Sequence, residues 1–139
     1  SAALAAHTMT LAPKNVFYVD DSTADLRRAA RSLARRGAAN RVTGIFATAD
    51  KLAVDLMDAL KDCGISVPGD ISLVGFDDMA ISAHTVPGLS TIRQDISRKA
   101  RLAVDLLFNQ IETKAPAPPH TVLDVSLVER ESVRTLSAE

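Results

Sequence analysis

The eight residues Ile71-Ser-Leu-Val-Gly-Phe-Asp-Asp78 decide how this chain is expected to fold. The run begins as a short, mostly apolar segment after the turn residues Pro68-Gly69-Asp70, and it ends in two carboxylates. Such a run is typical of a parallel strand covered on both faces, because burial of both faces removes the alternation of polar and apolar residues. Open α/β sheets bind ligands at the carboxyl ends of their strands. Asp77, which would lie at that edge, is therefore the first candidate for a binding residue.

Two similar units of apolar strand and amphipathic helix precede this run. The segment Val16–Val19 ends in Asp20 and Asp21, and the segment Val42–Ala47 leads to Asp50, which is expected to cap the next helix. Strands joined by helices over such short links form a right-handed parallel sheet, so all three strands are expected to bring an aspartate to one edge. The apolar faces of the two helices are Leu26, Ala29, Ala30 and Leu33, ended by Gly37, and Leu52, Ala53, Leu56, Met57, Leu60 and Cys63 in the helix 51–63.

The pattern changes after Asp78. Residues 79–90 show no period and predict a loop, residues 90–94 are extended, and residues 96–111 form an amphipathic helix capped by Asp95. A proline-rich link at 115–119 follows, and alternation over 123–127 predicts a last strand that is buried on one side. The fold class expected from this order is α/β, with a parallel sheet that has helices on both faces.

Length and composition limit the classes of protein that fit. A chain of 139 residues with 47% hydrophobic and 24% charged residues has room for one modest core and has ordinary globular composition. The net charge of −1 gives no basic footprint for DNA. Cys63 is the only cysteine, so an internal disulfide is excluded, and no secretion signal is visible, which favours the cytoplasm. Because the chain begins at Ser1 in a helical pattern, we expect a piece of a longer protein.

Three motifs taken together resemble the C-terminal half of LacI/GalR-type transcriptional regulators. They are the strand end Gly75-Phe-Asp-Asp78, the segment Pro87-Gly-Leu-Ser-Thr-Ile-Arg-Gln94 and the ending Leu127-Val-Glu-Arg-Glu-Ser132. Their order and spacing agree with that family from Ile45 to Ser132, and the weaker match is residues 1–36. The resemblance implies a fold like that of type I periplasmic binding proteins, in which two α/β lobes hold a small effector between them.

The resemblance also implies a division of the chain. Residues 1–89 would form most of the C-terminal lobe, and residues 90–95 would cross the hinge. Residues 96–119 would supply a helix and link of the N-terminal lobe, and residues 120–139 would return as a strand and tail. The DNA-binding domain and most of the N-terminal lobe are not in this sequence, so the helix 96–111 is expected to lack its partner surface.

Five positions are expected at the ligand site by this resemblance. Asp77 matches the aspartate that grips hydroxyls or ring nitrogens of the effector, and Gln94 matches a polar hinge residue near the ligand. Asp50 matches the second residue of an Asn-Asp pair in the family. Ala49 stands where the asparagine is usual, which removes the hydrogen bonds of an amide from the site. Asp20 lies near the place of an aromatic residue that often stacks on the effector.

A dimer contact is expected on the exposed side of the helix 51–63 and on the loop 79–85. Val54 and Asp58 are predicted to project from that side of the helix, and Ile81 and His84 belong to the loop. The family places a two-fold interface on these surfaces, so we predict that the four residues lie at the interface of a homodimer.

The leading hypothesis is the effector-binding and dimerisation part of a cytoplasmic transcriptional regulator that contacts operator DNA through a domain outside this sequence. We expect no enzymatic activity, no cofactor, no metal and no membrane contact. One alternative is a periplasmic solute-binding protein of the same fold. The other is a Mg²⁺-dependent, receiver-like phosphoryl-transfer domain, because aspartates at strand ends can hold a hard cation. The arginines Arg28, Arg31 and Arg35 share a helix face, which we interpret as solvated.

Overall fold

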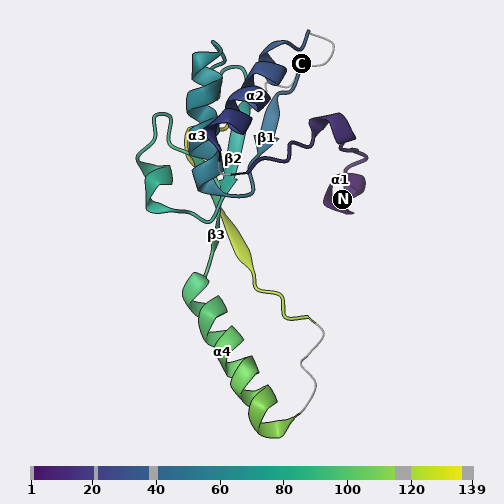
Figure 1. The fold of residues 1–139 in the computed structure, drawn as a ribbon, viewed down its shortest axis with the longest axis vertical. Coiled ribbons are helices and arrows are strands. Elements are labelled where there is room, and N and C mark those ends of the chain that lie inside the picture. Colours follow the sequence, from purple (N-terminus) through teal and green to yellow (C-terminus); the bar gives the residue numbers. More distant parts are fainter. Residues whose placement is uncertain (1, 21, 38–40, 115–119, 136–139) are drawn as a thin grey trace.

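The structure, a computed structural model, describes residues 2–20, 22–37, 41–114 and 120–135. Its centre is a sheet of four strands in the order β1 (Gly44–Phe46), β2 (Ser72–Phe76), β3 (Ser90–Gln94) and β4 (Val125–Val128). The first three strands are parallel, and β4 is antiparallel to β3. The predicted α/β fold class is therefore confirmed, and the sheet is parallel except for β4 (Figure 1).

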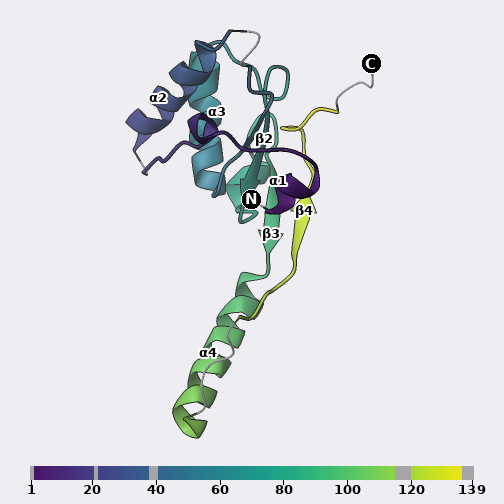
Figure 2. The same cartoon turned by 90° about the vertical axis from the view of Figure 1, so that its right-hand side faces the viewer.

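Four α-helices accompany the sheet in the described parts of the chain, with two short 3-10 helices in the connections. Figure 2 shows α2 and α3 on the same side of the strands, with α3 between α2 and the sheet. The prediction of helices on both faces is therefore not met among the described residues, because both helices that form the core cover one face. The predicted loop after Asp78 contains one of the 3-10 turns. The bounds are α1 (Ala2–Ala6), η1 (Pro13–Asn15), α2 (Thr23–Ala34), α3 (Asp50–Asp62), η3 (Ala80–Ala83) and α4 (Ile96–Thr113).

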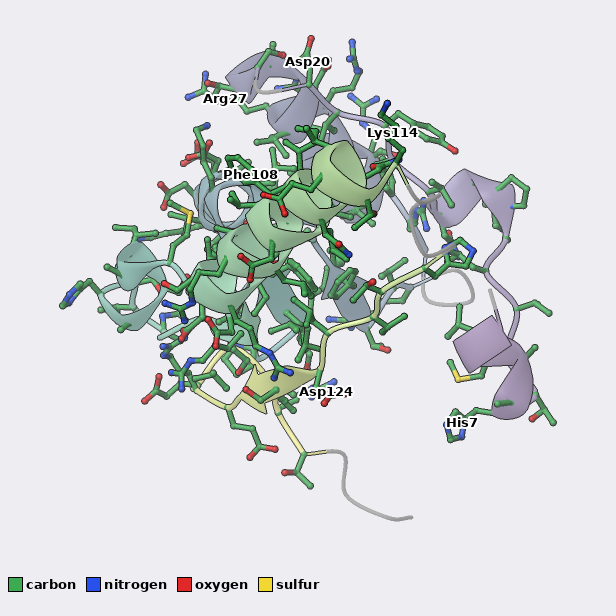
Figure 3. All side chains as sticks on the ribbon, turned by 90° about the horizontal axis from the view of Figure 1, so that it is seen from below. His7, Asp20, Arg27, Phe108, Lys114 and Asp124 are labelled. Atoms are coloured by element: carbon green, nitrogen blue, oxygen red, sulfur yellow. The ribbon has the colours of Figure 1, made fainter. Side chains whose placement is uncertain are left out.

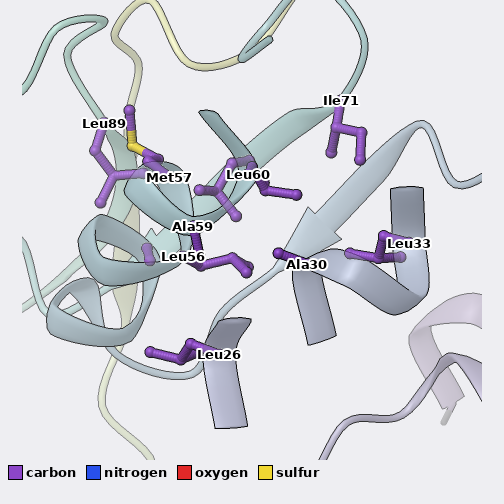
Figure 4. Packing of buried hydrophobic residues seen from close by; sticks show 11 residues of the cluster. Leu26, Ala30, Leu33, Leu56, Met57, Ala59, Leu60, Ile71 and Leu89 are labelled. Atoms are coloured by element: carbon purple, nitrogen blue, oxygen red, sulfur yellow. The ribbon is translucent and has the colours of Figure 1, made fainter. Parts of the chain in front are cut away.

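The core lies between α2, α3 and the sheet (Figure 4). The residues that the helical spacing predicted as apolar faces supply most of it, and Leu60, Leu73 and Leu89 are fully buried. Ser22 caps α2, because its side chain accepts a hydrogen bond from the Asp25 N–H at 3.3 Å. The buried cluster comprises Leu26, Ala30, Leu33, Ala53, Leu56, Met57, Ala59, Leu60, Ile71, Leu73 and Leu89.

The predicted strand Val16–Val19 is wrong. This segment is extended, but it belongs to no sheet, and β1 pairs with β2 alone among the described strands. It runs along α2 instead, where Phe17 lies under the guanidinium of Arg36 at 5.6 Å from the ring centre and Tyr18 is 92% exposed. An apolar run specifies extended backbone but not the neighbouring strand that its N–H and C=O groups need, and the described parts of the chain supply no such strand.

Helix α4 lies apart from the core at the far end of β3 and β4 (Figure 1). None of its residues is buried, and its apolar side chains Leu107, Phe108 and Ile111 are each more than half exposed. The one-sided burial predicted for the last strand is also wrong, because Val125 and Leu127 of β4 are exposed. Both elements thus have an apolar side that no described element covers. For α4 this was predicted, because the helix was expected to lack its partner surface. The division of the chain into a C-terminal lobe, a hinge and a segment of the N-terminal lobe stays a prediction.

Candidate binding site

The centre of the site is a contact between the ends of β2 and β3. Asp77 directly follows β2, and Gln94 is the last residue of β3. The side-chain amide of Gln94 donates a hydrogen bond from Nε2 to Asp77 Oδ1 at 2.6 Å, and Lys99 of α4 donates from Nζ to Gln94 Oε1 at 3.1 Å. Asp77 and Gln94 are half-buried, whereas Lys99 is exposed. A carboxylate, an amide and an ammonium group thus meet at the carboxyl edge of the sheet, where they can recognise a polar ligand.

The backbone at this edge is strained. Asp77 has a φ of 112° and Asp78 a φ of 53°, both in the region that L-residues other than glycine rarely adopt. The Asp77 N–H donates to the Ile92 carbonyl at 2.9 Å, which ties the strained turn to β3. Such conformations persist only where surrounding contacts hold them, and they are concentrated at ligand sites. The backbone geometry is therefore a second reason, independent of charge, to place a ligand site at Asp77 and Asp78.

Asp50 has a different environment from the one predicted. It is the first residue of α3 and not its N-cap, because Ala49 holds the cap position and makes no side-chain cap bond. The Asp50 carboxylate is fully buried and accepts three hydrogen bonds, from the Met79 N–H, the Ser82 hydroxyl and the Thr91 hydroxyl at 2.7, 2.7 and 2.5 Å. The predicted cap is thus wrong: the carboxylate lies under the site and connects α3, η3 and β3.

Gly75 makes room for this buried carboxylate. A Cβ at Gly75 would collide with Asp50 Oδ1 and would approach Leu89 Cδ2 to 3.0 Å. A glycine inside a strand often marks such a close approach, so this was the signal in the sequence that could have predicted the role of Asp50.

The two remaining predicted ligand positions are not joined to the Asp77–Gln94 contact by any hydrogen bond among the described residues. Ala49 is half-buried at the start of α3, and its carbonyl accepts from the Ala53 N–H. Asp20 is exposed and accepts a hydrogen bond from the Ser22 N–H at 3.0 Å; hydrogen bonds from Ser22 lower the pKa of Asp20. Figure 3 shows Asp20 at the outer margin of the molecule, beside α2. Because Val16–Val19 forms no strand, the structure does not bring Asp20 to the edge shared by β2 and β3.

Asp78, the second carboxylate of the opening motif, binds two arginines that the sequence did not connect with it. Its Oδ2 accepts from Arg93 Nε at 2.6 Å, and its Oδ1 accepts from Arg130 Nη2 at 2.8 Å. The hydrogen bond from Arg130, and next that from Arg93, holds the pKa of Asp78 below its usual value. Asp78, Arg93 and Arg130 each lie in one of the three motifs of the sequence. No spacing rule, however, pairs residues that are so far apart in the chain.

The ending Leu127–Ser132 is fixed to the sheet by its polar residues. Ser132 is fully buried, donates from Oγ to the Leu73 carbonyl at 2.6 Å and accepts from the Ser90 N–H at 2.8 Å. Arg130 donates from Nη1 to the Leu89 carbonyl at 2.7 Å. The motif therefore holds the returning chain against β2 and β3.

The four residues predicted at a dimer interface differ in exposure. Asp58, Ile81 and His84 are exposed, and Ile81 lies in η3. Val54 was expected to project into solvent, which is wrong: it is half-buried and packs against the core cluster of its own chain. The helical spacing placed Val54 beside polar residues, but it could not show how far the core extends around α3.

Other kinds of site receive no support from the described residues. Within 2–20, 22–37, 41–114 and 120–135, no group of three or more histidine, cysteine, aspartate or glutamate side chains is placed to hold a metal ion. No described helix is both long enough and apolar enough to cross a membrane. The surface hollows beside α2 involve Arg41 and Asp70 or Phe17 and Tyr18, not the Asp77–Gln94 contact.

Comparison with known proteins identifies the family. Residues 1–133 match the periplasmic binding protein-like domain. The chain is 42% identical over 91 residues to the transcriptional regulator MalR of Clostridium butyricum, covering 66% of this chain and 27% of MalR. It is 38% identical over 104 residues to the transcriptional regulator GalR of Escherichia coli K12, covering 74% of this chain and 30% of GalR. The chain thus spans less than a third of the length of these relatives.

A solved structure shows the same arrangement. The transcriptional regulator CelR in complex with cellobiose superposes with a TM-score of 0.79 at 29% identity, covering 94% of this chain and 39% of that one. These relatives fit the regulator hypothesis and neither the solute receptor nor the receiver-like domain. The chain therefore belongs to the periplasmic binding protein-like family, and its relatives are transcriptional regulators of the LacI/GalR type.

Proposed function

We propose that this chain is the C-terminal part of the effector-binding domain of a LacI-type transcriptional regulator, and that Asp77 and Gln94 bind the effector. The observation that carries the proposal is the 2.6 Å contact between these side chains at the ends of two parallel strands. A charged acceptor fixed by an amide neighbour orients hydroxyl groups through charge-assisted hydrogen bonds. The effector would be a sugar-like molecule, since CelR is a cellobiose complex.

The other predicted positions take indirect roles in this proposal. Asp50 is fully buried and already accepts hydrogen bonds from Met79, Ser82 and Thr91, so it supports the floor of the site rather than contacting the ligand. Ala49, at the start of α3, would contribute an apolar surface. Asp20 would contact an effector only if the segment before α2 lay closer to the sheet than it does here.

In the intact regulator, the ligand would change DNA binding through the balance between two lobe arrangements. A ligand shifts such a balance only by the difference between its affinities for the two states. Operator DNA would be bound by a domain outside this sequence, and the protein would act in the cytoplasm without enzymatic activity. The chain alone presents one wall of the cleft, so we expect weak sugar binding.

NMR titration of the isotope-labelled chain with cellobiose and a panel of mono- and disaccharides tests this site. A sugar that binds should shift the amide signals of Asp77, Asp78 and Gln94 in a saturable way. Asp77→Asn keeps the side-chain shape and removes the charge, so it should weaken binding about tenfold, as expected for loss of a hydrogen bond to a charged group. The exposed control Asp62→Asn, which lies outside the proposed binding and dimer sites, should bind like the wild type. Saturable shifts confined to other residues, or unchanged binding by Asp77→Asn, would remove Asp77 from the site.

We also propose that the chain forms a homodimer through Asp58, Ile81 and His84, with Val54 beneath them. The support is a group of exposed apolar side chains in and around η3, namely Met79, Ile81 and Val86, which are 47%, 46% and 96% exposed. Exposed apolar patches of this kind mark protein contacts.

Sedimentation velocity can separate this interface from one formed by α4. Ile81→Asp should convert a dimer into a monomer, because it would bury an unpaired charge in the contact. Ile111→Asp, on the exposed face of α4, should leave the dimer intact. A monomeric wild type at high concentration, or dissociation by Ile111→Asp alone, would contradict the proposed interface.

A further inference from the structure

Two chain segments connect the core to α4. The outgoing segment is β3, which continues through Asp95 into α4, and the returning segment is β4, which leads to Arg130 and Ser132. The two strands pair antiparallel from Thr91 and Val128 to Gln94 and Val125. Figures 1 and 2 show them as a two-stranded connection that carries α4 away from the core. The direction of α4 is therefore set where this connection meets the core.

Asp78 lies at that junction and binds both segments. Its carboxylate accepts from Arg93 of the outgoing strand and from Arg130 of the returning segment, one oxygen for each arginine. Its backbone N–H also points to the Thr91 hydroxyl at 3.4 Å. Arg130 in turn donates to the Leu89 carbonyl just before β3. One carboxylate at the end of β2 thus joins three pieces of chain.

The environment separates this arrangement from an ordinary surface ion pair. The side chains of Asp78 and Arg130 are only 11% and 18% exposed, whereas Arg93 is 59% exposed. Exposed pairs contribute little because water screens them and the side chains lose entropy. The Asp78–Arg130 pair is shielded, and the left-handed backbone of Asp77 and Asp78 needs surrounding contacts to hold it.

We propose that Asp78 is a positioning residue that ties the outgoing and returning segments to the end of β2 and so fixes the direction in which α4 leaves the core. Asp77, the adjacent residue, is the proposed ligand contact. A ligand at Asp77 would therefore act on the same strained turn that orients the connection, a consequence that rests on the proposed function. The tie itself exists without a ligand.

The experiment measures the position of α4 relative to the core in the full 139-residue chain without any ligand. Spin labels are placed at Lys61→Cys on α3 and Arg101→Cys on α4 in a Cys63→Ser background, and electron–electron distances are recorded in an excess of unlabelled chain, so that only distances within one copy contribute. Asp78→Asn is the decisive variant, since asparagine tolerates a left-handed backbone and loses only the charge. Hydrogen exchange is measured on the same variants.

Asp78→Asn should broaden the distance distribution and shift its mean. It should also accelerate exchange of the β3 and β4 amides up to about fivefold, as expected for loss of a partly screened hydrogen bond to a charged group, while the α2 and α3 amides keep their wild-type rates. Arg130→Lys, which keeps the charge but not the forked donor, should have a smaller effect in the same direction. Asp70→Asn is the matched control: it breaks the Asp70–Arg41 pair elsewhere on the core and should leave α4 unchanged.

The result that would overturn the proposal is a wild-type distance distribution in Asp78→Asn. Should that variant fail to fold, Arg93→Gln provides the second test, because Arg93 is largely exposed and its loss should broaden the distribution without unfolding the core. An unchanged distribution in Arg93→Gln would then reject the role of Asp78. Since no ligand is present, this outcome is independent of whether Asp77 binds a sugar.

Discussion

Helices α3 and α4 have similar amphipathic sequences and opposite surroundings. Six of the 13 residues of α3 are buried, whereas none of the 18 residues of α4 is. Leu60 of α3 is fully covered, and Leu107 of α4, at an equivalent place in its own pattern, is 56% exposed. The comparison teaches that an amphipathic pattern specifies a surface to be covered, and that it carries no information about whether the covering element is in the same chain.

Paired leucine substitutions test this contrast directly and should give the largest effect. Leu60→Ala removes a fully buried side chain from the core and should cost about 3 kcal/mol of unfolding free energy. Leu107→Ala removes an exposed side chain and should change the unfolding free energy by about 0.5 kcal/mol or less. Urea denaturation followed by circular dichroism measures both. Equal losses for the two variants would show that α4 is packed in solution and that the two helices do not differ in burial.

A second pair of substitutions tests how tightly the core is built around Asp50. Gly75→Ala forces a Cβ against the buried carboxylate and Leu89, so it should destabilise the core by about 2 kcal/mol. Gly44→Ala, in the edge strand β1, meets nothing within 4 Å and serves as the control. The same denaturation experiment applies. If Gly75→Ala were as stable as Gly44→Ala, Asp50 would not occupy the space that the structure gives it.

The elements with a complete local signal could be predicted from the sequence. The apolar spacing of α2, α3 and α4 and the run that became β2 each describe a segment whose own residues decide its conformation. The strand expected at Val16–Val19 failed because pairing depends on a neighbour that a local pattern does not name. The same limit explains why the burial of Val125 and Leu127 was overestimated.

The site was predictable only in part, for a related reason. The position of Asp77 and Gln94 at neighbouring strand ends follows from parallel topology, and the 2.6 Å contact agrees with it. The carboxylates of Asp50 and Asp77 look alike in the sequence, yet Asp50 is fully buried and Asp77 half-buried. The difference arises from η3 and Thr91, which supply donors to Asp50 from distant parts of the chain.

The contact of the returning chain with the core should have an intermediate effect on stability. Ser132→Ala removes a buried hydroxyl that bonds to the Leu73 carbonyl and the Ser90 N–H, and it should cost about 1.5 kcal/mol because two backbone groups lose their partner. Ser126→Ala, at an exposed position of β4, should have almost no effect. Hydrogen exchange should show the loss at β2 and β3 and not in α4. Equal stability of the two variants would mean that the ending motif is not fixed to the sheet.

The smallest expected effect is the pH dependence contributed by Asp78, where the core meets the connection to α4. Hydrogen bonds from Arg130 and Arg93 lower the pKa of Asp78 in the folded chain, so its contribution to stability is complete above the unfolded pKa of about 3.9 and is lost as the pH falls through the lower, folded value. Asp78→Asn should therefore be less stable than the wild type by about 1 kcal/mol or less near pH 7, and this difference should shrink below about pH 4. Urea denaturation between pH 3 and pH 7 measures the difference. Asp70→Asn is the reference, because its pKa is also lowered, by Ser66 in a turn that does not contact α4. The contrast between core and α4 requires that only Asp78→Asn changes hydrogen exchange in β3 and β4; the same change in Asp70→Asn would show that core stability as a whole, and not the Asp78 junction, controls the connection.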